Sequence, residues 1–265
     1  MTDASNTPHA YYLPISPGVY QPTIHVQGAW QDTEQHMAPI SGLITHELAT
    51  HEPRDDMQIG RLTFEILGMI PLQESTIRVQ TIRPGRTIEL LEATLEIGGR
   101  AIIRARAWRL ARSDMSDLAG LELPAMPQPA ECEPLDGTEE WPGGYIASLS
   151  IDAAPGGREG RRQAWVRSGC RLIEGVDADP LASYVMLVDT ANGIATRVRP
   201  TELMFPNVDL SLHLLRQPDP ALVGLDTSVS FGPDGLGLTS TVLNDVNGPV
   251  GRAEQCLTVR HFPTK

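Results

Sequence analysis

The stretch RLTFEILGMIP at residues 61–71 has a counterpart in VDLSLHLLRQP at residues 208–218. Both alternate apolar and polar side chains as a half-buried strand does, and both end in proline, which does not continue a central strand. The two stretches lie about 148 residues apart. Self-similarity at a fixed distance reveals architecture before any single element does. The sequence therefore predicts an internal duplication.

The regions that follow the two stretches agree as well. Each contains a second strand and a turn with proline, RPGR at residues 83–86 and GPDG at residues 232–235. A long alternating hairpin comes next in each half, at residues 88–110 with a Gly-Gly turn and at residues 238–259 with an Asn-Gly turn. The order and spacing of these features support the duplication.

One helix precedes the long strands in each half. Asp32 or Thr33 can cap the first helix, which is expected to end near His51. The second is expected to begin after Asp179, with proline in its first turn, and to stop at Gly193. A single apolar helix followed by hairpin-linked strands is best buried by a sheet that wraps around it, so we predict an α+β fold with one wrapped helix per repeat. The apolar residues at helical spacing are Met37, Ile40, Leu43, Ile44 and Leu48 in the first helix and Leu181, Tyr184, Val185, Leu187 and Val188 in the second.

Residues 114–144 separate the halves. This segment carries five prolines and a cluster of acidic residues and lacks a periodic apolar signal, which is typical of a linker. We therefore predict an N-terminal repeat at residues 11–113, a Pro-rich acidic linker at residues 114–144, and a C-terminal repeat at residues 145–262.

The composition excludes several classes of partner. The 265 residues are 41% hydrophobic, and 33 acidic against 21 basic residues give a net charge of −12. That field repels nucleic acid and anionic lipid heads, and no stretch approaches the roughly 20 apolar residues of a membrane span. Three cysteines without paired spacing, and a polar start without an apolar export segment, favour the cytoplasm. Unpaired sheet edges favour self-association into a homo-oligomer.

The sequence contains few features typical of metal-binding or nucleotide-binding proteins. The seven histidines are scattered, and His46 and His51 are one residue too far apart to share a helix face. Glycine-rich phosphate loops, dinucleotide fingerprints and a nucleophile elbow are absent in usable contexts. We therefore expect no metal and no cofactor.

Several segments together resemble the double hot-dog acyl-CoA thioesterases, the thioesterase II-like family. The resemblance extends from about Tyr11 to Arg260. It implies two hot-dog folds in one chain, with their sheets joined side by side, and hydrolysis of an acyl-CoA thioester. The segments that carry it are QHMAPISG at 35–42, IELLEA at 88–93, RARAW at 104–108, NVD at 207–209 and GPVGRAEQ at 248–255.

The resemblance also implies a site in the second repeat. Hydrolysis of a thioester requires an activated water and donors aimed at the oxygen that becomes negative. The family places an Asp on the first long strand after the second helix, a Thr or Ser on the next strand and a Gln on the last. These positions match Asp209, Ser230 and Gln255, and a shift of one or two residues would give Ser228 in place of Ser230. Both serines are expected on the same strand face, with Val229 on the other.

The duplication supports a single site. In our alignment Asp209 lies opposite Leu62, and Gln255 lies opposite Ala107, so the polar residues occur in one copy only. A core-facing Asp is too costly to keep without partners. The alternative interpretation is that Asp209 caps a strand end and Gln255 lies on a solvated edge.

Other residues are secondary candidates. His36, with Gln35, lies at a helix start, where free N–H groups can bind an oxyanion, and Asp189 lies inside the apolar second helix. The cluster of Arg158, Arg161 and Arg162 in a glycine-rich loop can bind the phosphates of CoA or can be a solvated loop.

Two competing functions remain. A non-catalytic acyl-CoA-binding or scaffold protein would keep the fold without a competent site. A hydratase or dehydratase on the same fold would need an Asp and a His as base and acid, and the only His on the strand of Asp209 is His213.

Overall fold

Strands β3 (Met57–Ile66) and β11 (Asp209–Leu214) pair antiparallel in the middle of one fourteen-stranded sheet. The computed structural model describes residues 9–263. The remaining strands are β1 (Ala10–Ser16), β2 (Val19–Pro22), β4 (Ser75–Arg83), β5 (Ile88–Ile97), β6 (Arg100–Ala111), β7 (Glu133–Leu135), β8 (Leu149–Ala153), β9 (Arg161–Ser168), β10 (Arg171–Ile173), β12 (Val223–Phe231), β13 (Leu236–Asp245) and β14 (Gly248–Thr258).

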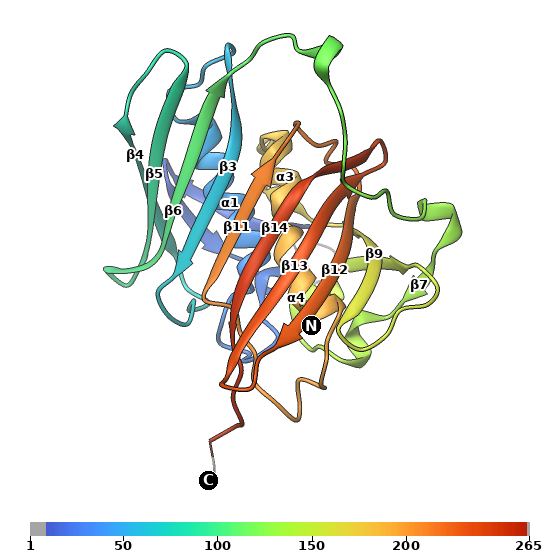
Figure 1. Cartoon of the computed structure of the whole chain (residues 1–265). Coiled ribbons are helices and arrows are strands. Elements are labelled where there is room, and N and C mark those ends of the chain that lie inside the picture. The colour runs from blue at the N-terminus through green and yellow to red at the C-terminus, as the bar shows by residue number, and fades with distance from the viewer. Residues whose placement is uncertain (1–8, 264–265) are drawn as a thin grey trace.

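The central pair divides the sheet into two sides of similar topology. One side runs β10-β1-β2-β4-β5-β6-β3 and the other runs β11-β14-β13-β12-β9-β8-β7. Figure 1 shows the blue and green strands on one side of β3 and β11 and the red, orange and yellow strands on the other. Every pairing is antiparallel except that of β1 with β10, which is parallel.

The hydrogen-bond register repeats between the two sides at a distance of 148 residues. Thr63 pairs with Arg106 on the first side, and the residues 148 positions later, Ser211 and Glu254, pair on the second. Thr63 and Ser211 also pair with each other, which places a pseudo-twofold axis between β3 and β11. The predicted duplication is confirmed by this register. Further pairs related in the same way are Leu91–Ala107 with Thr239–Gln255, and Ile77–Leu95 with Leu225–Leu243.

Helix α1 (Met37–Thr50) is buried along most of its length and packs against β3, β4 and β5. Its cap lies three or four residues later than the predicted caps, because residues 27–35 fold back through a Gln27–Gln35 bridge and the Nδ1 atom of His36 caps the helix. A Cβ atom at Gly42 would overlap Met186, so glycine is required where α1 crosses the second helical segment.

The second helical segment is interrupted. The sequence predicts one helix after Asp179, and the structure contains α3 (Pro180–Val185), η5 (Val188–Thr190) and α4 (Ala191–Ile194). The expected start is confirmed, since Asp179 caps α3 through Leu181 and Ala182 N–H. The other helices are η1 (Ile24–Val26), η2 (Ser116–Leu118), η3 (Pro129–Glu131), η4 (Gly137–Glu139) and α2 (Gly144–Ala147).

The Pro-rich segment at residues 114–144 crosses from β6 to the second half, and its later part packs on the sheet (Figure 1). Strand β7 pairs with β8, and the Pro127 carbonyl accepts a hydrogen bond from Trp165 Nε1 at 2.9 Å. Trp141 is 7% exposed. This part of the segment therefore contributes to the folded core, where we expected a linker.

Within residues 9–263, none of the helices has the length and apolar character required to cross a bilayer.

Candidate active site

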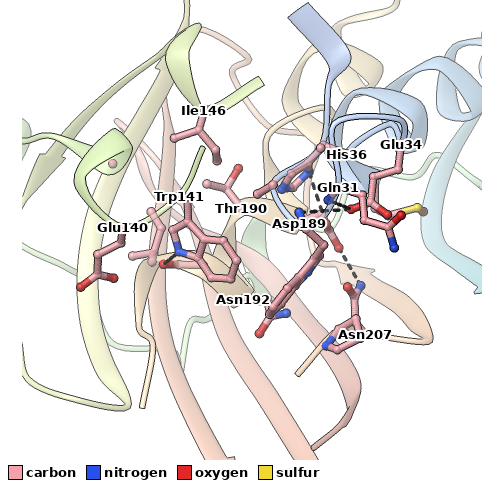
Figure 2. A pocket seen from close by; sticks show the side chains of 18 of the residues that line it. Gln31, Glu34, His36, Glu140, Trp141, Ile146, Asp189, Thr190, Asn192 and Asn207 are labelled. Carbon is pink, nitrogen blue, oxygen red and sulfur yellow. Dashed lines mark hydrogen bonds and ion pairs between the residues drawn. The ribbon is translucent and has the colours of Figure 1, made fainter. Parts of the chain in front are cut away.

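Asp189, in η5, is the centre of a polar cluster at the junction of the two halves (Figure 2). The residue is only 4% exposed. Its Oδ1 atom accepts hydrogen bonds from Asn207 Nδ2 and from Gln255 Nε2, each at 2.8 Å. No residue between 9 and 263 donates a hydrogen bond to its Oδ2 atom. One carboxylate oxygen is therefore fixed by two amides, and the other is available to a further donor.

The two amides come from neighbouring positions on the central strands. Gln255 lies on β14, is 1% exposed, and occupies the position that Ala107 has in the first half. Asn207 lies two residues before the start of β11 and also donates to the backbone carbonyl of Asp209 at 3.0 Å. The equivalent of Asn207 is Ile59, since the Ile59–Arg109 pair and the Asn207–Leu257 bridge are related by the same distance of 148 residues. The polar groups occur in one copy only.

His36 approaches Asp189 from the first half. Its Nδ1 atom accepts a hydrogen bond from Ala38 N–H at 3.1 Å and lies 3.7 Å from Asp189 Oδ2. Its ring packs on Tyr145 with centroids 4.3 Å apart. Burial lowers the pKa of His36 to about 3, so the imidazole is neutral near pH 7. Because Nδ1 accepts a hydrogen bond, the proton of the neutral ring is on Nε2.

Burial raises the pKa of Asp189 to about 7, and the hydrogen bonds from Asn207 and Gln255 partly oppose this effect. The nearby charge of Asp209 raises the pKa further. A carboxyl group with a pKa near the working pH can both accept and return a proton. The pair of Asp189 and His36 thus holds two titratable groups whose pKa values are shifted in opposite directions.

We expect Asp189→Asn to stabilise the fold at alkaline pH. A carboxyl with a raised pKa contributes stability below its unfolded pKa and loses that contribution as the pH rises through about 7. Asn carries no charge, so the gain at pH 8 relative to pH 4 should reach at most about 4 kcal/mol, since one pKa unit is about 1.4 kcal/mol. Denaturant unfolding of both proteins at the two pH values measures this. If the substitution changed the free energy of unfolding equally at pH 4 and pH 8, the prediction would be wrong.

The cluster opens into a cavity of about 430 Å³ that is lined by both halves. Met37 lines it at the start of α1, and the N–H of Met37 has no intrahelical acceptor and none elsewhere in residues 9–263. The positive end of the helix dipole is directed at this point. The apolar part of the wall is formed by Trp30, Ile66, Met69, Ile70, Leu135, Trp141, Ile146, Ile151, Ile194 and Met204.

Asp209, predicted as the site carboxylate, is half-buried and does not line this cavity. Its Oδ1 atom accepts a hydrogen bond from the backbone N–H of Cys256 at 2.6 Å. Our alignment placed it opposite Leu62, but the ladder register makes it the equivalent of exposed Arg61. A shift of one residue reverses the face of a strand, so the expectation of a core-facing Asp209 is wrong.

Ser230 is also outside the cluster. It is exposed on β12, and Ser228, two residues earlier on the same face, contacts the carbonyl of Ser240 at 3.4 Å. The inward side chains of this strand are Thr227 and Val229, which is the reverse of the predicted facing. The three predicted side chains therefore do not converge: only Gln255 contacts the polar cluster.

The sequence offered partial signals for the rest of the cluster. Asp189 and His36 were candidates, and Asn207 belongs to one of the segments that carry the family resemblance. Of the arginine cluster, Arg162 alone lines the cavity, whereas Arg161 forms an ion pair with Asp226.

A second hollow, of about 270 Å³, lies at the pseudo-symmetric position and is lined mainly by the first half, together with Asp179, Leu181 and Gln217 of the second. Asp179 there caps its helix as His36 does, and the N–H of Asp179 donates to His46 Nδ1 at 3.2 Å. Ile59 lines this hollow in place of Asn207. The hollow thus lacks the two amides that fix Asp189, which makes the 430 Å³ cavity the candidate active site.

No group of three or more His, Cys, Asp or Glu side chains in the described part of the chain is placed to hold a metal ion.

Solved structures that are similar to the chain define its class as hot-dog proteins. A conserved protein of unknown function with a hot dog fold from Alicyclobacillus acidocaldarius has a TM-score of 0.73 at 14% identity, with 93% of each chain covered. An acyl-CoA thioesterase II, TesB2, from Mycobacterium marinum has a TM-score of 0.69 at 15% identity, with 97% of each chain covered. These identities show the fold alone.

The family follows from the sequence profile. Residues 26–110 match the acyl-CoA thioesterase N-terminal domain, and residues 129–259 match the acyl-CoA thioesterase C-terminal domain. The chain belongs to the acyl-CoA thioesterase family, as the resemblance of its segments predicted. Among curated proteins, none matches the sequence.

Proposed function

We propose that the chain is a double hot-dog enzyme that hydrolyses an acyl-CoA thioester in the 430 Å³ cavity, with Asp189 as the base. The observation that carries this proposal is the geometry of Asp189. One of its oxygens is held by Asn207 and Gln255, and the other lies beside the start of α1 without a donor among residues 9–263. A water molecule that donates to Oδ2 would therefore be held against the thioester carbonyl.

The reaction can be written with these groups alone. The water oxygen attacks the thioester carbon while Asp189 takes a proton from that water. The N–H of Met37 donates to the carbonyl oxygen, which becomes negative. Collapse of the tetrahedral intermediate breaks the carbon–sulfur bond. The protonated Asp189 then returns its proton to the CoA thiolate, and free acid and CoA leave. Gln255 stays in the site but holds the Asp189 carboxylate, and Asp189 and Asn207 take the places that the resemblance gave to Asp209 and Ser230.

The pH profile is the direct test of the base. Only ionised Asp189 can accept the proton, so we expect kcat/KM for acyl-CoA hydrolysis to rise tenfold per pH unit below about 7 and to level off above it. Release of the CoA thiol, measured over a series of acyl chain lengths, gives the rates. His36, with its pKa near 3, should contribute no second step in this range. A profile that is flat between pH 5 and 8 would rule out Asp189 as the base.

A hydratase is a second candidate, because His36 and Asp189 approach each other from the two halves of the chain. Such an enzyme would add water to a 2-enoyl-CoA without releasing thiol. A 2-enoyl-CoA substrate separates the two functions: loss of enoyl absorbance without thiol supports hydration, and thiol release supports hydrolysis. Binding of acyl-CoA without either reaction would support the non-catalytic alternative.

Cytoplasmic residence and self-association stay predictions from the sequence. Light scattering of the purified chain measures its mass in solution and so tests self-association.

A further inference from the structure

Arg162 is a half-buried arginine whose guanidinium has neither an acceptor nor a carboxylate partner among residues 9–263. Its Nε atom is inaccessible to solvent and has no acceptor among residues 9–263, and the group forms no ion pair with any of them. The other partly buried arginines are compensated: Arg109 binds Glu89, and Arg216 binds Asp245. A guanidinium carries a charge and five N–H donors, so burying one without acceptors costs free energy.

The strand pattern directs Arg162 toward the cavity. On β9 it lies on the same face as the buried residues Ala164 and Val166, and it lines the cavity with Leu135 and Ile151. Arg161 lies on the opposite face, paired with Asp226. Of these two adjacent arginines, therefore, only Arg162 can meet a ligand in the cavity.

The surrounding loops add positive charge. In the loop that precedes β9, the N–H of Gly160 donates a hydrogen bond to the carbonyl of Thr196 in a second loop, at 3.0 Å. The two loops carry Arg158, Arg197 and Arg199. Asp136, Glu139 and Glu140 line the cavity, and Glu159 lies in the loop that precedes β9. Asp136 accepts a hydrogen bond from Thr138, and Glu140 accepts one from Thr196. None of these four acidic residues forms an ion pair with Arg162.

We propose that Arg162 binds an anionic oxygen group of the substrate, either a phosphate of CoA or a carboxylate at the far end of the acyl chain. This inference rests on the proposed function, because it assigns a ligand group to the same cavity. Both groups present paired oxygens that match the guanidinium fork. The apolar neighbours Leu135 and Ile151 strengthen the interaction by excluding water.

Arg162→Gln tests the proposal, with Arg104→Gln, an exposed residue of β6, as the matched control. The first arm compares binding of CoA with binding of pantetheine, read by the fluorescence of Trp30 and Trp141 in the cavity wall. The second arm compares KM for glutaryl-CoA with KM for pentanoyl-CoA. We expect Arg162→Gln to weaken the anionic member of one pair about 10- to 100-fold with kcat nearly unchanged. Arg162→Lys should restore part of this loss.

The arms identify the source of the anion. A loss confined to CoA relative to pantetheine assigns a phosphate, and a loss confined to glutaryl-CoA assigns a carboxylate. Unchanged ratios in both arms, in a variant that melts like the parent, would overturn the proposal. If the parent hydrolyses no thioester, the proposed function fails, while the same ligands titrated without turnover still test Arg162.

Discussion

Asp189→Asn should lower kcat for thioester hydrolysis by about 10²- to 10⁴-fold, the range expected for the loss of a general base. Asn has the shape of Asp and keeps an oxygen that can accept the hydrogen bonds of Asn207 and Gln255. The Nδ2 amide that replaces Oδ2 cannot accept a proton, so the water in the cavity is no longer activated. KM should change little, because the substituted group contacts the water rather than the acyl chain. Steady-state thiol release at pH 8 measures both parameters.

The matched control is Asp209→Asn. Asp209 accepts a hydrogen bond from the Cys256 backbone and does not line the cavity. The kcat of the Asp209→Asn variant should therefore remain within a few fold of the parent value. If Asp209→Asn abolished turnover while Asp189→Asn retained it, the assignment of the base would be reversed. Equal retention by both variants would remove the carboxylate mechanism altogether.

Arg109→Leu should lower the free energy of unfolding by about 3–5 kcal/mol, the cost of breaking a buried ion pair from one side. Arg109 is 4% exposed and donates to Glu89 at 3.1 Å. It also donates to the carbonyls of Leu48 and His51, each at 2.6 Å, at the end of α1. The substitution leaves these carbonyls without a donor in the core, and it leaves the Glu89 carboxylate with only the longer ion pair to Arg54, at 3.8 Å. The shift of the urea midpoint, at constant slope, measures the loss.

Arg106→Leu on the same strand is the control for Arg109. Its side chain is 60% exposed and forms a surface ion pair with Glu92, which is worth at most about 1 kcal/mol. Adding Glu89→Leu to Arg109→Leu should recover part of the stability, because it removes the buried charge that has lost its hydrogen bond from Arg109. A loss of similar size for Arg106 and Arg109 would show that the buried network is not what stabilises this end of α1.

The scaffold was predictable where local chemistry decides it. The hairpin of β5 and β6 turns at Gly98 and Gly99, both with positive φ, and the alternation of apolar residues fixes its faces. The interruption of the second helix was not predictable, because α1 crosses it where Gly42 meets Met186, a contact between segments far apart in sequence. Apolar periodicity alone predicts that helix as continuous.

The candidate site shows the same division. Gln255 was placed correctly opposite Ala107, since the repeat distance holds along β14. Asp209 was misplaced by one residue, which in a strand is the difference between core and surface. The apolar helix around Asp189 made it a secondary candidate, but its amide partners come from other elements and are not visible in the residues around it.

Strand β10 belongs to the second half by sequence, yet it forms the outer edge of the first half beside β1. During synthesis the first half therefore leaves the ribosome with β1 unprotected on one side and β3 unprotected on the other. Open edges of this kind recruit other chains. The protein cannot be cut between its repeats into two independent modules, and its assembly must wait for the later half to arrive.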